Sequence, residues 1–126
     1  MTPRLAIVTA ALLMAAAVAF GAFGAHALRP RIRPEMLAVW QTGVDYHGWH
    51  ALGLLLLGAL MLHFPDNAPL RYAAWLFIAG VALFSGSLYL LALGAGSAVG
   101  AITPFGGVAF IAGWLTLAVG IARQLR

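Results

Sequence analysis

The densest group of chemically active side chains is the stretch Thr42–His50, with the sequence TGVDYHGWH. It combines a carboxylate (Asp45), a phenol (Tyr46), two imidazoles (His47 and His50) and an indole. Such groups transfer protons, ligate metals or anchor a helix at a membrane surface. The residues that follow, 51–62, include no charged side chain, so the stretch stands where a helix enters an apolar environment.

Helix geometry decides whether this stretch alone can bind a metal. At about 100° per residue, His47 and His50 lie roughly 60° apart, whereas Asp45 lies about 140° from His50. The three side chains therefore converge only if the helix breaks near Gly48 or if His26 joins from elsewhere. Imidazoles with a further ligand suit zinc, iron or copper. We keep His26, His47 and His50 as a lesser metal-binding alternative, and we predict no bound metal and no cofactor.

Polar residues from three segments form a candidate binding, proton or ion site. Ser85 and Tyr89 are four residues apart and share one helix face. His26 ends the first apolar segment on the side where the second begins. In a shared pocket, His26, His50 and Ser85 are expected to approach one another. The predicted polar cluster comprises His26, Asp45, Tyr46, His50, Ser85, Ser87 and Tyr89.

A second arrangement closes these groups without a ligand. Asp45 then pairs with an arginine of the first loop, and the histidines hydrogen-bond to serines or to Tyr89, because unpaired polar groups are costly inside a membrane. Neither Ser85 nor Ser87 lies in a Gly-x-Ser-x-Gly turn. The sequence therefore predicts no catalytic residues.

The composition indicates a membrane protein. Of 126 residues, 63% are hydrophobic and 8% charged, which is outside the range of ordinary soluble domains. Four apolar segments of about 20 residues take up most of the chain, and each is long enough to cross a hydrocarbon core about 30 Å thick. Without cysteine, neither disulfides nor thiolate metal sites can form. All seven basic residues are arginines spread over the segment ends, which argues against nucleic-acid binding.

These segments must position the polar residues. We predict an all-α membrane protein, a single domain over 1–126, folded as an antiparallel bundle of four transmembrane helices with a short interfacial helix. The first segment exceeds the 7–15-residue core of a signal peptide, so we expect it to be retained. The expected spans are about 5–27, 45–64, 72–93 and 103–123, and the interfacial helix covers about 34–43.

Small residues are expected to bring the helices close together. Ala17, Gly21, Gly24 and Ala25 form one stripe, and Gly106, Gly113 and Gly120 recur every seven residues along the fourth segment. Thr103 is the expected N-cap of that segment, with Pro104 in its first turn.

The ends of the segments carry candidate membrane anchors. We predict that Arg29, Arg31, Arg33, Trp40 and Trp49 contact lipid headgroups. Both termini lie on one side with Arg4, Arg71, Arg123 and Arg126, opposite the three arginines of the first loop. We place the termini in the cytoplasm of a bacterial cell, with the chain as a multi-pass protein of the inner membrane.

Four ordered motifs carry a family resemblance: residues 21–28 (GAFGAHAL), 42–50 (TGVDYHGWH), 84–89 (FSGSLY) and 103–107 (TPFGG). Together they resemble the domain-of-unknown-function family 423, small bacterial inner-membrane proteins similar to eukaryotic transmembrane protein 256. The resemblance covers nearly the whole chain. It implies a four-helix membrane protein and no particular activity.

The expected function is that of a non-enzymatic accessory or structural membrane protein with a polar cluster near one membrane face. The first alternative is a small oligomeric transporter or ion- and proton-handling protein. The second is a His-ligated membrane metalloprotein. The expected partners are the lipid bilayer and either further copies of the chain or another membrane protein, with no nucleic acid.

Overall fold

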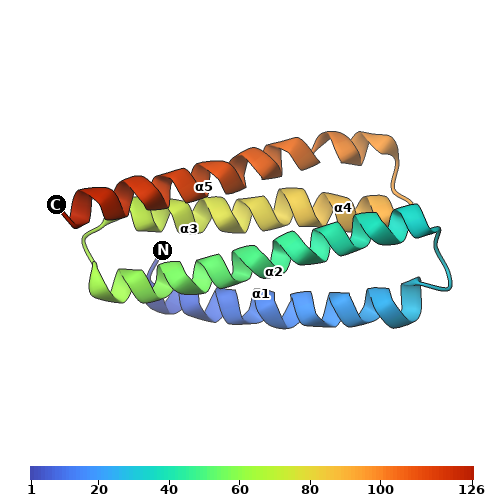
Figure 1. Ribbon diagram of the computed structural model, residues 1–126, viewed down its shortest axis with the longest axis horizontal. Helices are drawn as coiled ribbons and strands as arrows, with labels where there is room; N and C mark the ends of the chain where they lie inside the picture. Colours follow the sequence, from blue (N-terminus) through green and yellow to red (C-terminus); the bar gives the residue numbers. More distant parts are fainter.

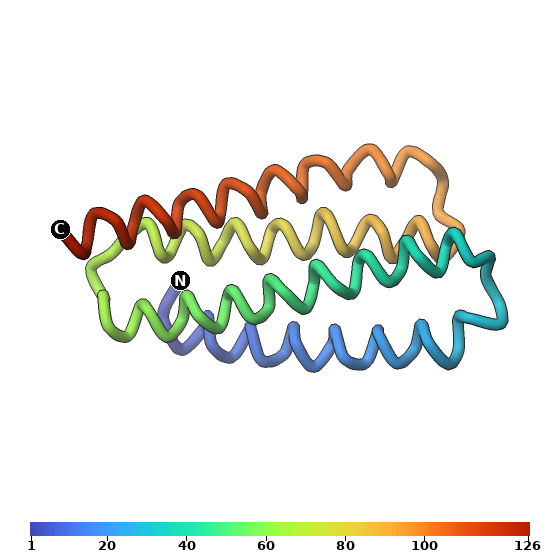
Figure 2. Tube along the Cα trace, in the orientation of Figure 1, coloured from blue at the N-terminus to red at the C-terminus, as the bar shows by residue number.

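In the computed structural model, which describes residues 1–126, the chain folds into four long helical rods and no strands. Figures 1 and 2 show how these rods lie side by side. Two of the rods change from α-helix to a wider π-helical turn along their length. In order, the elements are α1 (Pro3–Phe23), η1 (Gly24–Leu28), α2 (Pro34–His63), α3 (Ala68–Gly80), η2 (Val81–Ser85), α4 (Gly86–Ala92), η3 (Ser97–Ala101) and α5 (Thr103–Gln124).

The rods run antiparallel, because each short connection reverses the chain. The N- and C-termini lie at one end with the turn between α2 and α3, and the loops after η1 and α4 lie at the other end (Figure 1). Each rod packs on the one before it: α2 on α1, the α3–η2–α4 rod on α2, and α5 on α3 and η2. The second rod is therefore flanked on two sides, and it carries the Thr42–His50 stretch.

The separate interfacial helix expected at 34–43 is wrong. One α-helix of 30 residues, α2, runs from Pro34 to His63 and includes both that segment and the second predicted span. Pro34 occupies the first turn, where its missing N–H is not needed, and the next proline, Pro65, follows the end of the helix. Gly43 and Gly48 do not interrupt the helix, because glycine lowers helix stability but does not remove a backbone hydrogen bond.

Three rods are long and apolar enough to cross a membrane: Pro3–Leu28, Ala68–Ala92 and Ser97–Gln124. The second rod, α2, is not among them. Its middle carries Asp45, His47 and His50, which lower its average hydropathy although the residues that follow are rich in leucine.

Large apolar side chains cover much of the outer surface of the bundle. Twenty-four large hydrophobic side chains are exposed, including Leu12 and Val18 at 67% and Phe105 at 70%. A water-soluble protein rarely exposes apolar area so continuously. Lipid is the surrounding that makes such a surface favourable.

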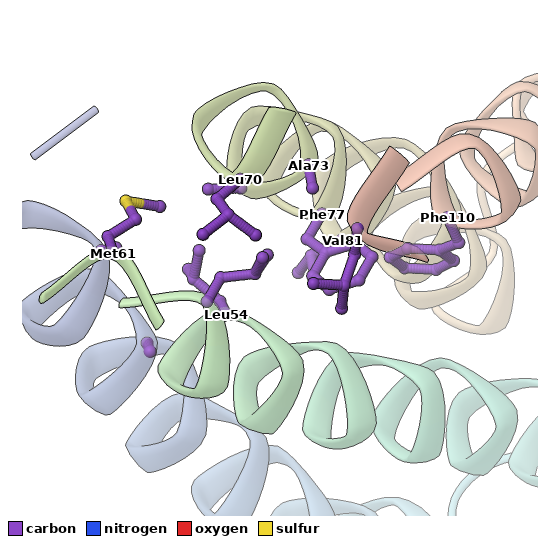
Figure 3. Packing of buried hydrophobic residues seen from close by; sticks show 12 residues of the cluster. Leu54, Met61, Leu70, Ala73, Phe77, Val81 and Phe110 are labelled. Atoms are coloured by element: carbon purple, nitrogen blue, oxygen red, sulfur yellow. The ribbon is translucent and has the colours of Figure 1, made fainter. Parts of the chain in front are cut away.

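The core gathers where α2, α3 and α5 meet (Figure 3). Leu54, Leu70 and Phe77 are fully buried there, and Phe110 of α5 lies beside Val81 of η2. This packed layer fixes the distance between α2 and α5, and the polar residues of α2 lie next to it.

Glycines bring α5 against the third rod, as the seven-residue spacing predicted. The three glycines of this spacing, Gly106, Gly113 and Gly120, are all buried. A Cβ at Gly106 would lie 2.2 Å from the backbone nitrogen of Phe84, and one at Gly113 would lie 2.6 Å from the Phe77 ring. The first contact is with the main chain, so the two helices approach as closely as backbones can.

Two π-helical segments, η1 and η2, lie within spanning rods. In each, a backbone N–H reaches the carbonyl five residues back, as Arg29 does to Gly24 at 3.0 Å. Such turns are rare, and they shift the side chains that follow around the helix axis. The segment η1 falls within the motif GAFGAHAL (residues 21–28), and η2 ends in the first two residues of the motif FSGSLY (residues 84–89).

Candidate functional site

His50 is the most fully bonded polar residue of α2. Its Nε2 accepts a hydrogen bond of 3.0 Å from the indole N–H of Trp114 on α5, and its Nδ1 lies 2.7 Å from the carbonyl oxygen of Tyr46. The imidazole also stacks on Phe110, with ring centroids 3.5 Å apart and planes at 11°. The side chain is 5% exposed, so it is an interior group facing away from lipid.

These contacts determine the protonation state of His50. A carbonyl oxygen can only accept, so Nδ1 carries the proton, and Nε2 must be unprotonated to accept from an indole that can only donate. The ring is therefore neutral, and both nitrogens are occupied. In this arrangement His50 joins α2 to α5 and has no free lone pair for a metal.

His47, two residues after Asp45, is bonded at one nitrogen only. Its Nδ1 lies 2.8 Å from the hydroxyl oxygen of Tyr89 on α4, which links α2 to the third rod. The side chain is 3% exposed, and Nε2 has no partner. The backbone of Leu13 on α1 faces the imidazole without reaching regular hydrogen-bond geometry. His47 thus has the one unpaired imidazole nitrogen in the interior.

Trp40 packs inside the bundle and not at the headgroups, so its predicted anchoring role is wrong. It is 3% exposed, and its Nε1 donates a 2.8 Å hydrogen bond to the carbonyl oxygen of Phe20. Gly24 makes this contact possible, because a Cβ there would lie 2.7 Å from two atoms of the indole ring. The Trp40 ring also packs on Tyr89, with centroids 4.6 Å apart. A buried indole needs an acceptor for its N–H, and α1 supplies it.

The serines of the third rod bond to other helices. Ser85 is fully buried and donates to the carbonyl oxygen of Gly43 on α2 at 2.7 Å. Ser87 donates to the Phe84 carbonyl, and its oxygen lies 2.6 Å from the Thr103 hydroxyl. Thr103 is therefore not the expected N-cap of α5. The residue before it, Ile102, takes that position, and the threonine hydroxyl bonds to Ser87.

Two members of the predicted polar cluster lie outside the interior. His26 is exposed on η1 and makes no side-chain hydrogen bond, so the structure does not bring it to His50 or Ser85. Asp45 is exposed as well and accepts a 2.8 Å bond from Gln41, one turn earlier, instead of pairing with an arginine. No three His, Asp or Glu side chains gather in a way that would hold a metal.

The predicted anchors of the first loop remain accessible. Arg29, Arg31 and Arg33 are exposed at the end of the bundle, and Trp49 is 58% exposed on α2. Headgroup contact stays a prediction for these four residues.

Three aromatic residues contact the polar side chains but were not included in the polar cluster predicted from the sequence. Trp114 and Phe110 complete the His50 site from α5, and Phe20 of α1 packs edge-on against the rings of both His47 and Tyr89. The buried Asn67 in the turn after α2 donates to the Gly120 carbonyl at 3.0 Å. Each pair joins residues far apart in sequence, and no spacing rule within one helix relates them.

Known proteins match the chain over most of its length. Residues 20–107 match the family model described as Protein of unknown function (DUF423), a range that includes both π-helical segments and the Thr42–His50 stretch. The chain is similar to UPF0382 membrane protein YwdK of Bacillus subtilis, at 48% identity over 109 residues that cover 86% of this chain and 89% of the relative. It is also similar to UPF0382 membrane protein SH2409 of Staphylococcus haemolyticus, at 43% identity over 116 residues, 92% and 93% of the two chains. No solved structure matches significantly.

Proposed function

This chain belongs to the DUF423 family, whose relatives are named as membrane proteins, and we propose that it is a four-span protein of the bacterial inner membrane with a non-enzymatic accessory or structural role. Both termini face the cytoplasm in this proposal. The apolar outer surface contacts lipid and either further copies or a membrane partner.

The pairing of interior polar groups is the observation that supports a structural role. His50, Ser85 and Ser87 are all buried, and each is hydrogen-bonded to a group on another rod or in its own helix. Groups satisfied in this way join helices in a medium that supplies no water. A transport path needs polar groups that are free to exchange partners, and these three are not.

The geometry of α2 favours a fourth span. At about 1.5 Å per residue its 30 residues extend about 45 Å, more than the hydrocarbon core needs. The helix is flanked by α1 and by the α3–α4 rod along its length, so His47 and His50 face protein instead of lipid, whereas Asp45 is exposed. Pairing within the bundle offsets the low hydropathy of its first half.

His47 supports the alternative of proton or ion handling. Its Nε2 has no partner although the side chain is 3% exposed, and its Nδ1 contacts the Tyr89 hydroxyl. Intramembrane ionisable groups often mark proton routes. This single observation keeps the alternative open to test.

Reconstitution into proteoliposomes separates the two functions. The purified protein is placed in vesicles that enclose a pH-sensitive dye, and proton and alkali-cation fluxes are followed after a pH or potential jump. A structural role predicts fluxes equal to those of protein-free vesicles. A flux well above that background that disappears in His47→Phe, with a His63→Phe control at the end of α2 retaining it, would overturn the structural role.

Photo-crosslinking tests the accessory role directly, because this role requires a protein partner. A photo-crosslinking side chain at an exposed lipid-facing position, such as Leu12 or Val108, is expected to give one discrete protein adduct in native membranes. Adducts with lipid alone at every exposed position would leave the chain without a protein partner and contradict the accessory role.

A further inference from the structure

A hollow between α2 and α5 is lined almost entirely by aromatic rings. It has a volume of about 420 Å³, within the range of roughly 300–1,000 Å³ typical of small-molecule sites. Tyr46 and Trp49 from α2 form one side, and Ile111 of α5 lies on the other. The ring-bearing lining residues are Tyr46, Trp49, His50, Phe84, Phe110 and Trp114.

The packing of the rods creates this space. α5 packs on α3 and η2, and α2 packs on α1 and the third rod, so α2 and α5 meet through side chains. His50 makes that bridge through Phe110 and Trp114. Gly107 contributes no side chain, and a Cβ there would still lie 3.8 Å from the Phe84 ring. The hollow is thus bounded by fixed rings and kept open by a glycine.

Two residues of the lining carry hydrogen-bond donors that have no partner in the protein. None of the side-chain hydrogen bonds uses the Tyr46 hydroxyl or the Trp49 indole N–H. His50 and Trp114 are already bonded to each other. No charged side chain lines the hollow. Its chemistry therefore suits a neutral ligand that carries hydrogen-bond acceptors.

The exposure of the residues at the rim of the hollow limits the class of ligand further. Trp49 is 58% exposed and Ile111 63% exposed, so the hollow opens on the outer apolar surface. A ligand must then arrive through lipid. Ring faces favour a flat partner, because offset-stacked and edge-to-face arrangements are the preferred aromatic contacts.

We propose that this hollow binds the ring of a lipid-soluble quinone, whose carbonyl oxygens accept from Tyr46 and Trp49 and whose isoprenoid tail extends into the bilayer. A phospholipid acyl chain would also be apolar, but it has no acceptor for the two donors and gains nothing from flat walls. The proposal concerns binding only and assigns no electron transfer to the chain. It is independent of the accessory role, since a structural protein and a transporter could each hold such a ligand.

Binding is measured on the full chain in nanodiscs made from quinone-free phospholipid. The discs are titrated with a naphthoquinone that carries one short prenyl group, and bound quinone is extracted and quantified above the level in protein-free discs. We expect saturable binding of one quinone per chain. Removing one hydrogen bond with Tyr46→Phe or Trp49→Phe is expected to raise Kd about two- to tenfold.

Substitutions that fill the hollow test the proposal more sharply than the loss of one hydrogen bond. Gly107→Leu projects a side chain into the hollow and is expected to abolish saturable binding, and Gly107→Ala is expected to weaken it while leaving the fold intact. Val108→Leu, on the exposed neighbouring position of α5, is the matched control and should bind like the parent chain. Should Gly107→Leu fail to fold, Gly107→Ala and the two hydrogen-bond variants decide the matter.

Three results would overturn the proposal. One is the absence of saturation, which means that quinone only partitions into the lipid. Another is equal binding by the Gly107 variants and Val108→Leu. The third is equal displacement by a saturated alkane of matched length, which has no acceptor and would identify the hollow as a site for acyl chains.

Discussion

The bond between Trp114 and His50 shows how a polar residue is tolerated in the apolar interior. The indole N–H has one acceptor and the imidazole has two partners, so none of the three nitrogens is left unsatisfied. In hydrocarbon no water can replace a lost partner. The value of this bond to stability is nevertheless modest, because the unfolded chain in a membrane also finds partners.

A double-mutant cycle measures that value. Trp114→Phe keeps a ring but removes the donor, and His50→Phe removes the acceptor. We expect the two changes to be coupled by about 0.6 kcal/mol, and by no more than about 1.7 kcal/mol, in the free energy of unfolding by SDS titration in mixed micelles. Strictly additive effects would show that the bond does not join the two helices.

Neighbouring glycines on α5 provide a matched pair of substitutions. A Cβ at Gly106 would lie 2.2 Å and 2.7 Å from backbone atoms of Phe84, whereas a Cβ at Gly107 has 3.8 Å to the nearest ring atom. Overpacking of this kind costs about 1–3 kcal/mol. Gly106→Ala should therefore lower the free energy of unfolding by about that amount, and Gly107→Ala should leave it nearly unchanged. Equal effects of the two changes would contradict the close approach of α5 to η2.

At the scale of residues the sequence predicted the placement of some side chains better than it predicted their partners. His50, Ser85 and Ser87 are buried and Tyr89 is half-buried, and all four are hydrogen-bonded; their role as a site stays a prediction. His26 and Asp45 were grouped with them but are exposed. Spacing along one helix gives the relative directions of its side chains, whereas the choice of partner depends on how other helices are rotated. Two π-helical turns change that rotation, and no periodicity in the sequence marks them.

Local sequence signals determine where the helices begin and end. Prolines stand in the first turn of α1, α2, α3 and α5, and short polar or small-residue connections separate the rods. The predicted span limits accordingly agree with the observed ends to within a few residues, except at the start of α2. There, a separate interfacial helix was predicted at 34–43, but the polarity of a segment determines where a helix lies and not whether it continues.

The π-helical segment η1 is supported by its contact with α2. Gly24 allows Trp40 to reach the Phe20 carbonyl, and a Cβ there would lie 2.7 Å from the indole Nε1. Gly24→Ala should therefore separate η1 from α2 and destabilise the bundle by about 1–3 kcal/mol, despite the higher helix propensity of alanine.

Gly48→Ala is the control for this change. Gly48 is also a helical glycine, but a Cβ there meets no atom within 4 Å. Its substitution is expected to be neutral or slightly stabilising in the same SDS titration. If Gly24→Ala were no more harmful than Gly48→Ala, the contact between Trp40 and α1 would contribute nothing to helix packing.

At the scale of the whole molecule, the distribution of polarity is that of a protein surrounded by lipid. Leucines, valines and phenylalanines cover the outside, and hydrogen-bonded histidines and serines lie between the rods. All seven arginines lie in the first or last turn of a helix, in a loop or at the C-terminus, and none lies in the middle of a rod. This arrangement accounts for the high apolar content without a large apolar core.

The apolar pattern of the sequence was sufficient to predict an all-helical chain, because a hydrocarbon medium permits few other structures, and three of the four predicted spans correspond to rods long and apolar enough to cross a membrane. It was not sufficient to give the order of packing. Each rod packs on the rod before it in the sequence because the connections are short and because glycines let neighbouring helices approach closely.

The crossing of the membrane by α2 is the claim on which the account most depends, and cysteine labelling measures it directly. Since the native chain has no cysteine, single cysteines at Arg31, Asp66, Ser97 and Leu125 can each be tested in spheroplasts with a membrane-impermeant maleimide. The account predicts labelling at positions 31 and 97, and labelling at 66 and 125 only after the membrane is opened. If positions 31 and 66 are labelled from the same side, α2 does not cross, and the pairing of its histidines inside a four-span bundle is wrong.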